Sequence, residues 1–223
     1  MEKKIPVMVL GATGSVGQRF VQLLDNHPWF EVAALTGSER KAGKKYGESC
    51  HWVLDEPMPE WARDLPVLPS EPLPERARLA FSALPADIAR EIEPEFARAG
   101  IWICSNASAY RHEPDVPILL PEVNAHHIDV LEAQRKSRGW PAGIVTNPNC
   151  ASTGLTVALK ALQDSFGLKR AFVVTLQSVS GAGYPGLPSM DILDNVIPYI
   201  GGEEDKLEWE PRKMLGNVDA GQI

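Results

Sequence analysis

A cysteine at the expected start of a helix is the residue of this chain best suited to covalent chemistry. Cys150 follows Asn147-Pro148-Asn149 and lies between an apolar run, residues 142–146, and a helix-like stretch, residues 150–166. Free N–H groups and the dipole at a helix N-terminus stabilise an anion, so a thiol there ionises readily and can act as a nucleophile. A lone cysteine is more often a half-buried structural residue, so other motifs must decide between the two interpretations.

A glycine-rich turn near the N-terminus predicts a dinucleotide site. Gly11-Ala12-Thr13-Gly14-Ser15-Val16-Gly17 lies between an expected strand, residues 6–10, and an expected helix, residues 15–24. Glycines let the backbone approach a pyrophosphate, the helix N-terminus supplies N–H donors, and Thr13 and Ser15 add hydroxyl groups. The glycine pattern alone is a weak signal, but its position between a strand and a helix favours nucleotide binding over a purely structural turn.

The residues after the second expected strand, residues 31–35, indicate which dinucleotide is bound. NAD sites usually place an Asp or Glu there, whereas NADP sites offer Arg and hydroxyl groups to the 2′-phosphate. Ser38, Arg40 and Lys41 follow the strand, and they favour NADP. Glu39 complicates this interpretation because its carboxylate could contact the ribose, and Arg40 and Lys41 could equally form a solvated loop.

Alternating strands and helices typical of a parallel α/β sheet fill the first ~110 residues of the chain. Further strands are expected over residues 79–84 and 101–104, helices over 86–99 and from about 128, and a proline-rich surface excursion over 57–74. After Asn149 we expect a helix over 150–166, a β-branched strand over 170–180, and helices over 190–199 and 203–215. We therefore expect a doubly wound parallel sheet followed by the first part of an α+β domain in a truncated chain.

Composition narrows the class of protein. The formal net charge of −7 argues against a general nucleic-acid-binding protein or a membrane-surface protein, and no apolar run approaches the ~20 residues of a membrane span. Cys50, Cys104 and Cys150 show no C-x-x-C spacing, which suits a reducing compartment such as the cytoplasm. The adjacent His126 and His127 cannot face the same side of a helix, so we expect no metal site.

Seven short motifs follow one another along nearly the whole chain. They are residues 11–18, 81–85, 105–111 (Ser-Asn-Ala-Ser-Ala-Tyr-Arg), 120–124, 147–150 (Asn-Pro-Asn-Cys), 176–183 and 201–206 (Gly-Gly-Glu-Glu-Asp-Lys). Together they resemble the aspartate-semialdehyde dehydrogenase family, and its archaeal and fungal branch more than the common bacterial one. The resemblance implies a Rossmann-type NADP-binding domain over 1–148, an incomplete catalytic and dimerisation domain over 149–223, and a homodimer or homotetramer.

The resemblance also implies a reaction, the NADPH-dependent reductive dephosphorylation of L-aspartyl 4-phosphate to L-aspartate 4-semialdehyde. This step feeds the synthesis of lysine, methionine and threonine. Cys150 would carry the acyl group as a thioester, Gln177 would orient the substrate, and Asn149 with the N–H groups beside Cys150 would stabilise the oxyanion. The other residues that the resemblance implies are Ser82, Leu84, Gly181 and Gly183 for the cofactor and Asn106, Arg111, Glu203 and Lys206 for the substrate. By spacing alone, Glu203 and Lys206 could be an ordinary surface ion pair.

One departure from the family pattern concerns the general acid/base. The family uses a histidine, preceded by an arginine for the substrate carboxylate, downstream of the segment that carries Glu203 and Lys206, whereas no histidine follows His127 here. We therefore expect this chain by itself to have little or no turnover but to bind NADP. Two alternatives stay open: a sibling enzyme such as N-acetyl-glutamyl-phosphate reductase, and a non-catalytic NADP-binding fragment.

Overall fold

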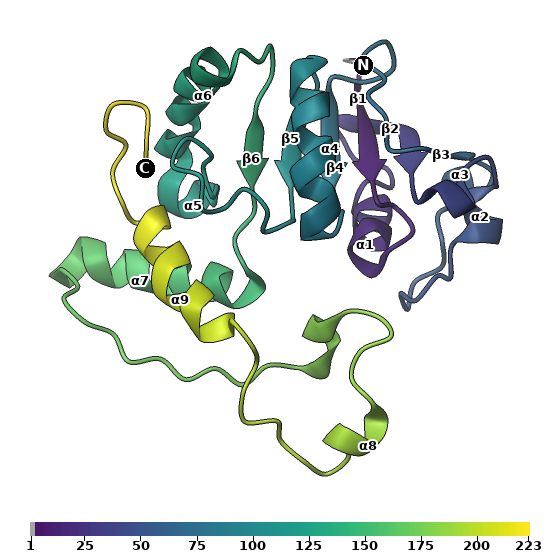
Figure 1. Cartoon of the computed structure of the whole chain (residues 1–223). Helices are drawn as coiled ribbons and strands as arrows, with labels where there is room; N and C mark the ends of the chain where they lie inside the picture. The colour runs from purple at the N-terminus through teal and green to yellow at the C-terminus, as the bar shows by residue number, and fades with distance from the viewer. Residues whose placement is uncertain (1–2) are drawn as a thin grey trace.

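A six-stranded parallel sheet forms the centre of the molecule in a computed structural model that describes residues 3–223 (Figure 1). Its strands are β1 (Ile5–Leu10), β2 (Phe30–Thr36), β3 (Val67–Leu68), β4 (Leu79–Ser82), β5 (Trp102–Ser105) and β6 (Ile144–Thr146). They are ordered β3-β2-β1-β4-β5-β6, and every neighbouring pair runs parallel. The doubly wound sheet predicted from the sequence is confirmed, and the proline-rich excursion supplies its short edge strand, β3.

Helices connect the strands and continue beyond the sheet. They are α1 (Ser15–Leu23), η1 (Glu39–Lys41), α2 (Tyr46–Ser49), α3 (Glu60–Arg63), α4 (Ala86–Arg98), α5 (Pro121–Asn124), η2 (Ala125–Asp129), α6 (Val130–Arg138), α7 (Cys150–Phe166), η3 (Val179–Ala182), α8 (Ser189–Ile192) and α9 (Glu203–Met214). The expected helices over 15–24, 86–99, 150–166 and 203–215 are therefore confirmed. α4 is followed by Gly100 with φ of +84°, a backbone conformation that favours glycine.

The core lies on both faces of the sheet because successive side chains of a strand point to opposite sides. In β1, Val9 packs in a cluster that contains Val21 of α1, whereas Leu10 packs in a second cluster that contains Phe96 of α4. All four side chains are fully buried. Burial on both faces explains why the strand reads as a continuous apolar run rather than as an alternating one.

The carboxyl ends of the strands point toward the half of the molecule that holds α7 and α9 (Figure 1). The chain winds from β1 outward to β3 on one side and from β4 outward to β6 on the other, so the order reverses between β1 and β4. In open α/β sheets ligands bind at such a reversal, beyond the carboxyl ends of the strands.

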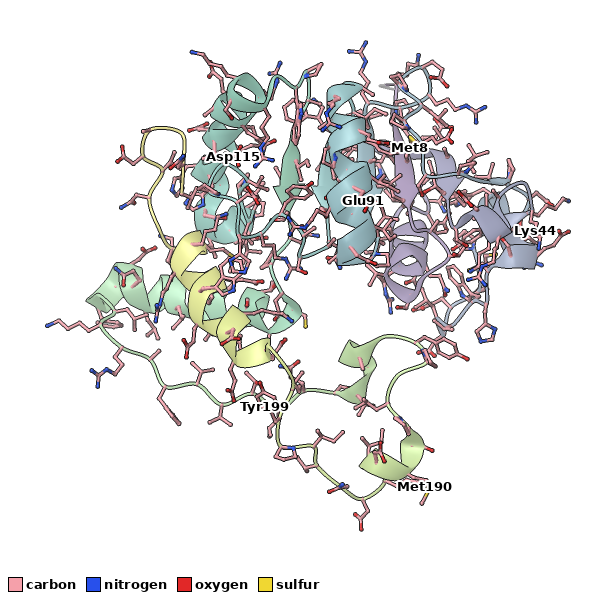
Figure 2. All side chains as sticks on the ribbon, viewed as in Figure 1. Met8, Lys44, Glu91, Asp115, Met190 and Tyr199 are labelled. Atoms are coloured by element: carbon pink, nitrogen blue, oxygen red, sulfur yellow. The ribbon has the colours of Figure 1, made fainter. Side chains whose placement is uncertain are left out.

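Two expectations for the second half of the chain are wrong. None of residues 170–180 forms a strand, and only residues 190–192 of the expected helix over 190–199 are helical, as part of α8. Phe172 and Leu176 are 95% and 93% exposed, and Figure 2 shows Met190 and Tyr199 on this open segment. A strand needs a hydrogen-bonded neighbour, and no strand among residues 3–223 pairs with this segment.

None of the helices formed by residues 3–223 combines the length and apolar character needed to cross a bilayer.

Candidate active site

The glycine-rich turn packs directly against the end of β4. Gly11 has φ of +70°, and a Cβ at this position would lie 2.8 Å from the carbonyl oxygen of Ala83. A Cβ on Gly17 would overlap the Gly11 carbonyl oxygen, so both positions require glycine for the close approach. Ser82, which is fully buried, and Leu84 lie beside the turn, at the end of β4. The glycine-rich turn therefore lies where the order of the sheet reverses, between β1 and β4.

Buried polar groups fix the shape of this turn. The Tyr46 hydroxyl donates to the Ala12 carbonyl oxygen at 2.8 Å, and Gln18 Nε2 donates to the Thr13 carbonyl oxygen at 3.3 Å. Burial raises the pKa of Tyr46, so its phenol remains a proton donor. Gly14, the N-cap of α1, provides no side-chain acceptor for the first turn of that helix. The N–H groups at the start of α1 therefore meet the requirements of an anion site.

The residues predicted to select the nucleotide lie beside this turn. Ser38 and Arg40 are exposed just beyond β2, and Lys41 Nζ donates to Thr13 Oγ1 at 3.0 Å. Glu39 is exposed and opens the short helix η1. Positive charge thus reaches the glycine-rich turn itself, through a contact of Lys41 that the sequence pattern did not specify.

Cys150 is the first residue of α7, as the sequence predicts. Asn149 is the N-cap, and its Oδ1 accepts hydrogen bonds from the N–H groups of Ala151 at 2.9 Å and Ser152 at 3.2 Å. Cys150 is exposed, whereas Cys50 is buried and Cys104 is partly buried. The candidate nucleophile is therefore the accessible thiol of the three and is held at a capped helix start.

The carboxylate of Glu203 binds three other predicted site residues. Glu203 Oε2 accepts hydrogen bonds from Asn149 Nδ2 at 3.2 Å and from Lys206 Nζ at 3.4 Å, and Glu203 Oε1 accepts one from Gln177 Nε2 at 3.2 Å. Glu203 is 7% exposed. Its burial and its three donors distinguish it from a surface ion pair with Lys206, and the contacts gather the four residues around the start of α7.

Arg111 lies in the same region with its guanidinium facing protein groups. Nη1 forms an ion pair with Glu210 Oε1 at 2.9 Å, and Nη2 donates to the Asn106 carbonyl oxygen at 3.0 Å. The side chain of Asn106 accepts a hydrogen bond from Asn147 Nδ2 at 3.4 Å. Two of the three guanidinium nitrogens are thus engaged within the protein, and the expected role of Arg111 as a phosphate ligand stays a prediction.

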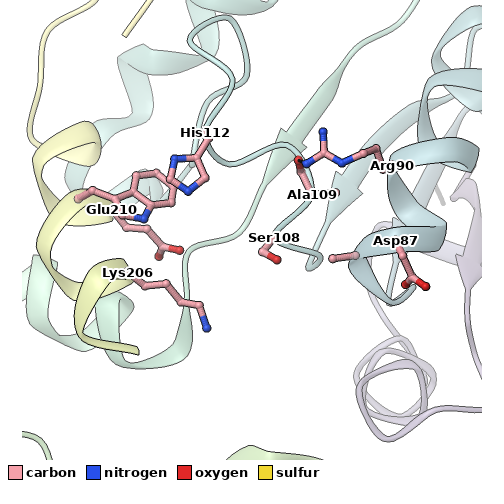
Figure 3. A pocket seen from close by; sticks show the side chains of 9 residues that line it. Asp87, Arg90, Ser108, Ala109, His112, Lys206 and Glu210 are labelled. Atoms are coloured by element: carbon pink, nitrogen blue, oxygen red, sulfur yellow. Dashed lines mark hydrogen bonds between the residues drawn. The ribbon is translucent and has the colours of Figure 1, made fainter. Parts of the chain in front are cut away.

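A cavity of about 330 Å³ lies between α4 and α9 next to these residues (Figure 3). Asp87 and Arg90 line it from α4, and Lys206 and Glu210 line it from α9. The His112 ring, also at its edge, stacks on Trp209 with 3.7 Å between ring centroids. Lys206 reaches both this cavity and Glu203, so the open space adjoins the cluster at the start of α7.

The segment after Gln177 runs from this cluster to the glycine-rich turn. A Cβ on Gly183 would lie 4.0 Å from Ser15 Oγ, and the rings of His51 and Tyr184 lie 5.4 Å apart. Gly181 lies in η3, between the two ends of this connection. This path brings residues 181–183 toward the glycine-rich turn, and their contact with a cofactor stays a prediction.

Glu210 and Lys213 are the residues of this region that the motifs did not identify. Glu210 lies one turn after Lys206 and two turns after Glu203 on α9, and Lys213 lies two turns after Lys206, which is the signal that could have indicated them. Lys213 Nζ donates to the carbonyl oxygens of Glu113 at 2.6 Å and of Arg111 and Val116 at 2.8 Å. Burial lowers the pKa of Lys213 to about 8.

Comparisons with known proteins give the family. The profile of the semialdehyde dehydrogenase NAD binding domain matches residues 6–131, and that of the semialdehyde dehydrogenase dimerisation domain matches residues 159–223. An aspartate-semialdehyde dehydrogenase of Archaeoglobus fulgidus is 53% identical over 97% of this chain, which spans 63% of that relative. One of Schizosaccharomyces pombe is 48% identical over 96% of this chain and 61% of its own length.

A solved structure supports the same assignment. The aspartate-semialdehyde dehydrogenase of Candida albicans with NADP superposes with a TM-score of 0.85 at 45% identity, over 97% of this chain and 62% of that one. The archaeal and fungal character of these relatives agrees with the branch that the motifs indicated. With the first profile alone matching more than half of its residues, the chain belongs to the semialdehyde dehydrogenase family.

Proposed function

We propose that this protein is an NADP-dependent aspartate-semialdehyde dehydrogenase that reduces L-aspartyl 4-phosphate to L-aspartate 4-semialdehyde and phosphate. The observation that carries the proposal is the convergence of Asn149, Gln177, Glu203 and Lys206 on the helix start occupied by the exposed Cys150. The family and the names of the relatives support the same substrate class.

Cys150 acts as the nucleophile. Its thiolate attacks the acyl carbon, the bond from this carbon to the phosphate oxygen breaks, and phosphate leaves, so that a thioester forms on Cys150. NADPH, when bound, supplies the hydride that reduces the thioester carbon. The carbon–sulfur bond then breaks, which releases the aldehyde and restores the thiolate.

The neighbouring side chains position the substrate. Gln177 orients the acyl group beside Cys150, and Asn149 holds the first turn of α7 in the geometry that stabilises an oxyanion. A carboxylate has about four acceptor positions, and Glu203 uses three of them, so a substrate amino group can bind at the fourth. Lys206 neutralises the phosphate, and Asn106 and Arg111 complete the substrate region.

NADP fits the residues at the reversal of the sheet. Gly14, exposed at the start of α1, leaves the helix N-terminus without a side-chain cap, and this end would hold the pyrophosphate. Ser38 and Arg40 are exposed where a 2′-phosphate would lie, and Lys41 adds charge at Thr13. The remaining path toward Cys150 would be lined by Ser82, Leu84, Gly181 and Gly183.

We further propose that the protein is a homodimer or homotetramer, and the match of the dimerisation domain supports this assembly. We also propose that it acts in the cytoplasm.

Turnover of the full-length protein tests the proposal. We expect reduction of NADP with aspartate semialdehyde and phosphate, no comparable rate with N-acetylglutamate semialdehyde, and loss of at least 10³-fold in Cys150→Ser. Cys50→Ser is the control and should retain activity. Equal rates for the two semialdehydes, or an active Cys150→Ser variant, would refute the proposal.

A further inference from the structure

Glu210 lies at the meeting point of three segments that are distant in sequence. It is fully buried on α9, and each of its carboxylate oxygens has a different partner. Oε1 pairs with Arg111 Nη1 at 2.9 Å, and Oε2 accepts the backbone N–H of Asn149 at 2.7 Å. Arg111 also donates to the Asn106 carbonyl oxygen just beyond β5. One carboxylate therefore connects the end of β5 to the residue that precedes Cys150.

We propose that Glu210 is a positioning residue that fixes the Pro148–Asn149 peptide, and with it the residue before Cys150, for thioester chemistry, a role that rests on the function proposed above. Glu210 touches neither the thiol nor a reacting atom. It acts by holding the backbone N–H of the N-cap residue, and through it the direction in which α7 begins.

The helix that carries Glu210 is held on both sides of it. Toward the N-terminus, Glu203 binds Asn149 and Gln177, and toward the C-terminus, Lys213 binds three backbone carbonyl oxygens of residues 111–116. Glu210 therefore cannot follow a small shift of the start of α7. A rigid anchor of this kind is what a reaction needs in which sulfur, acyl carbon and hydride donor must be aligned within a few tenths of an ångström.

The ion pair with Arg111 is not a sufficient reason for a carboxylate at this place. Buried ion pairs contribute little net stability, and an apolar pair of similar volume is often as stable. An apolar side chain, however, could not accept the N–H of Asn149. The contact with the backbone N–H of Asn149, in the Pro148–Asn149 peptide, is thus the part of the arrangement that a packing role leaves unexplained.

Two substitutions of Glu210 test the positioning role. Glu210→Gln keeps the shape but has only one acceptor oxygen, so either Arg111 or Asn149 loses its partner. Glu210→Asp keeps the charge opposite Arg111, but it is one methylene shorter and cannot reach both partners. In the full-length protein we expect both variants to lower kcat at least tenfold, with KM for NADP within about twofold. Glu208→Gln, exposed on the same helix, is the matched control and should have unchanged kcat.

Alkylation of Cys150 by iodoacetamide supplies a readout that needs no substrate. We expect the rate at Cys150, followed by mass spectrometry, to fall at least threefold in Glu210→Asp, while its NADP binding shows that the first domain is folded. An unchanged kcat and alkylation rate in folded Glu210→Asp would overturn the proposal. If the unsubstituted protein fails to use aspartate semialdehyde, the proposed function fails, and the alkylation rates alone then decide the role of Glu210.

Discussion

Single carboxylates organise this site at the scale of residues. Glu203 and Glu210 lie two turns apart on α9, and between them they bind the side chain and the backbone of Asn149. Each is also paired with a cation, Lys206 or Arg111. The two acids therefore hold Asn149 from two directions, and the thiol of the next residue is exposed while the two acids are buried.

The positive charge beyond β2 gives a prediction for nucleotide choice. Arg40→Ala should weaken NADPH binding about tenfold or more, because a charge-assisted contact with phosphate is lost, while NADH binding changes little. Fluorescence titration with the two nucleotides measures the difference. Lys44→Ala, an exposed lysine of the same loop (Figure 2), is the control and should leave both affinities unchanged. Equal losses for NADPH and NADH would contradict a 2′-phosphate contact of Arg40.

At the scale of elements, His127 of η2 ties the turn after α9 to the sheet-bearing domain. The ring accepts from Asn124 Nδ2 through Nδ1 and donates from Nε2 to the Gly216 carbonyl oxygen, both at 3.0 Å. This assignment makes the ring a neutral imidazole with both nitrogens satisfied. Neither a metal nor a catalytic role is needed to explain this histidine.

The buried ring predicts a dependence of stability on pH. Burial lowers the pKa of His127, so the unfolded chain binds a proton below about pH 6.5 that the folded protein does not. The free energy of unfolding should therefore fall as the pH drops below about 6.5, with a slope from this group of at most ~1.4 kcal/mol per pH unit. Urea unfolding at about pH 5 and pH 7.5 measures the slope. His127→Gln should flatten it and His126→Gln, an exposed neighbour, should not; the opposite pattern would disprove the assignment.

The sequence predicted elements well where local pattern and tertiary partner coincide. β1, α1 and the start of α7 follow from apolar runs, glycines and an Asn cap, all of which act over a few residues. The expected strand over 170–180 was wrong because β-branched residues only favour an extended backbone. A strand also needs a hydrogen-bonded neighbour, and no strand among residues 3–223 pairs with this segment. Glu210 was missed for a related reason, since its two partners lie 61 and 99 residues away.

At the scale of the whole molecule, the chain has two parts of very different packing. The sheet is covered on both faces by two buried clusters. By contrast, large apolar side chains of the segment 166–200 are exposed, among them Phe166, Phe172 and Leu176. The second part is held to the first mainly through the contacts of α7 and α9, so the two parts should respond separately to perturbation.

Hydrogen exchange tests this division. Amides of β1, β4 and β5 should exchange most slowly, since they lie at the centre of the sheet, and amides of residues 170–176 should exchange close to the rate of an unstructured peptide. Mass spectrometry of peptic fragments resolves the two regions. Slow exchange over 170–176 would show instead that this segment pairs as a strand with another polypeptide.

The placement of Glu203 and Glu210 so far after Cys150 also has a consequence for biosynthesis. A growing chain leaves the ribosome with its cysteine long before α9 emerges, and domains fold in the order in which they are made. The first domain can thus fold while the segment before Cys150 still lacks the two acids that bind Asn149. The proposed nucleophile therefore gains these two neighbours last, when the translated helix docks against the finished sheet.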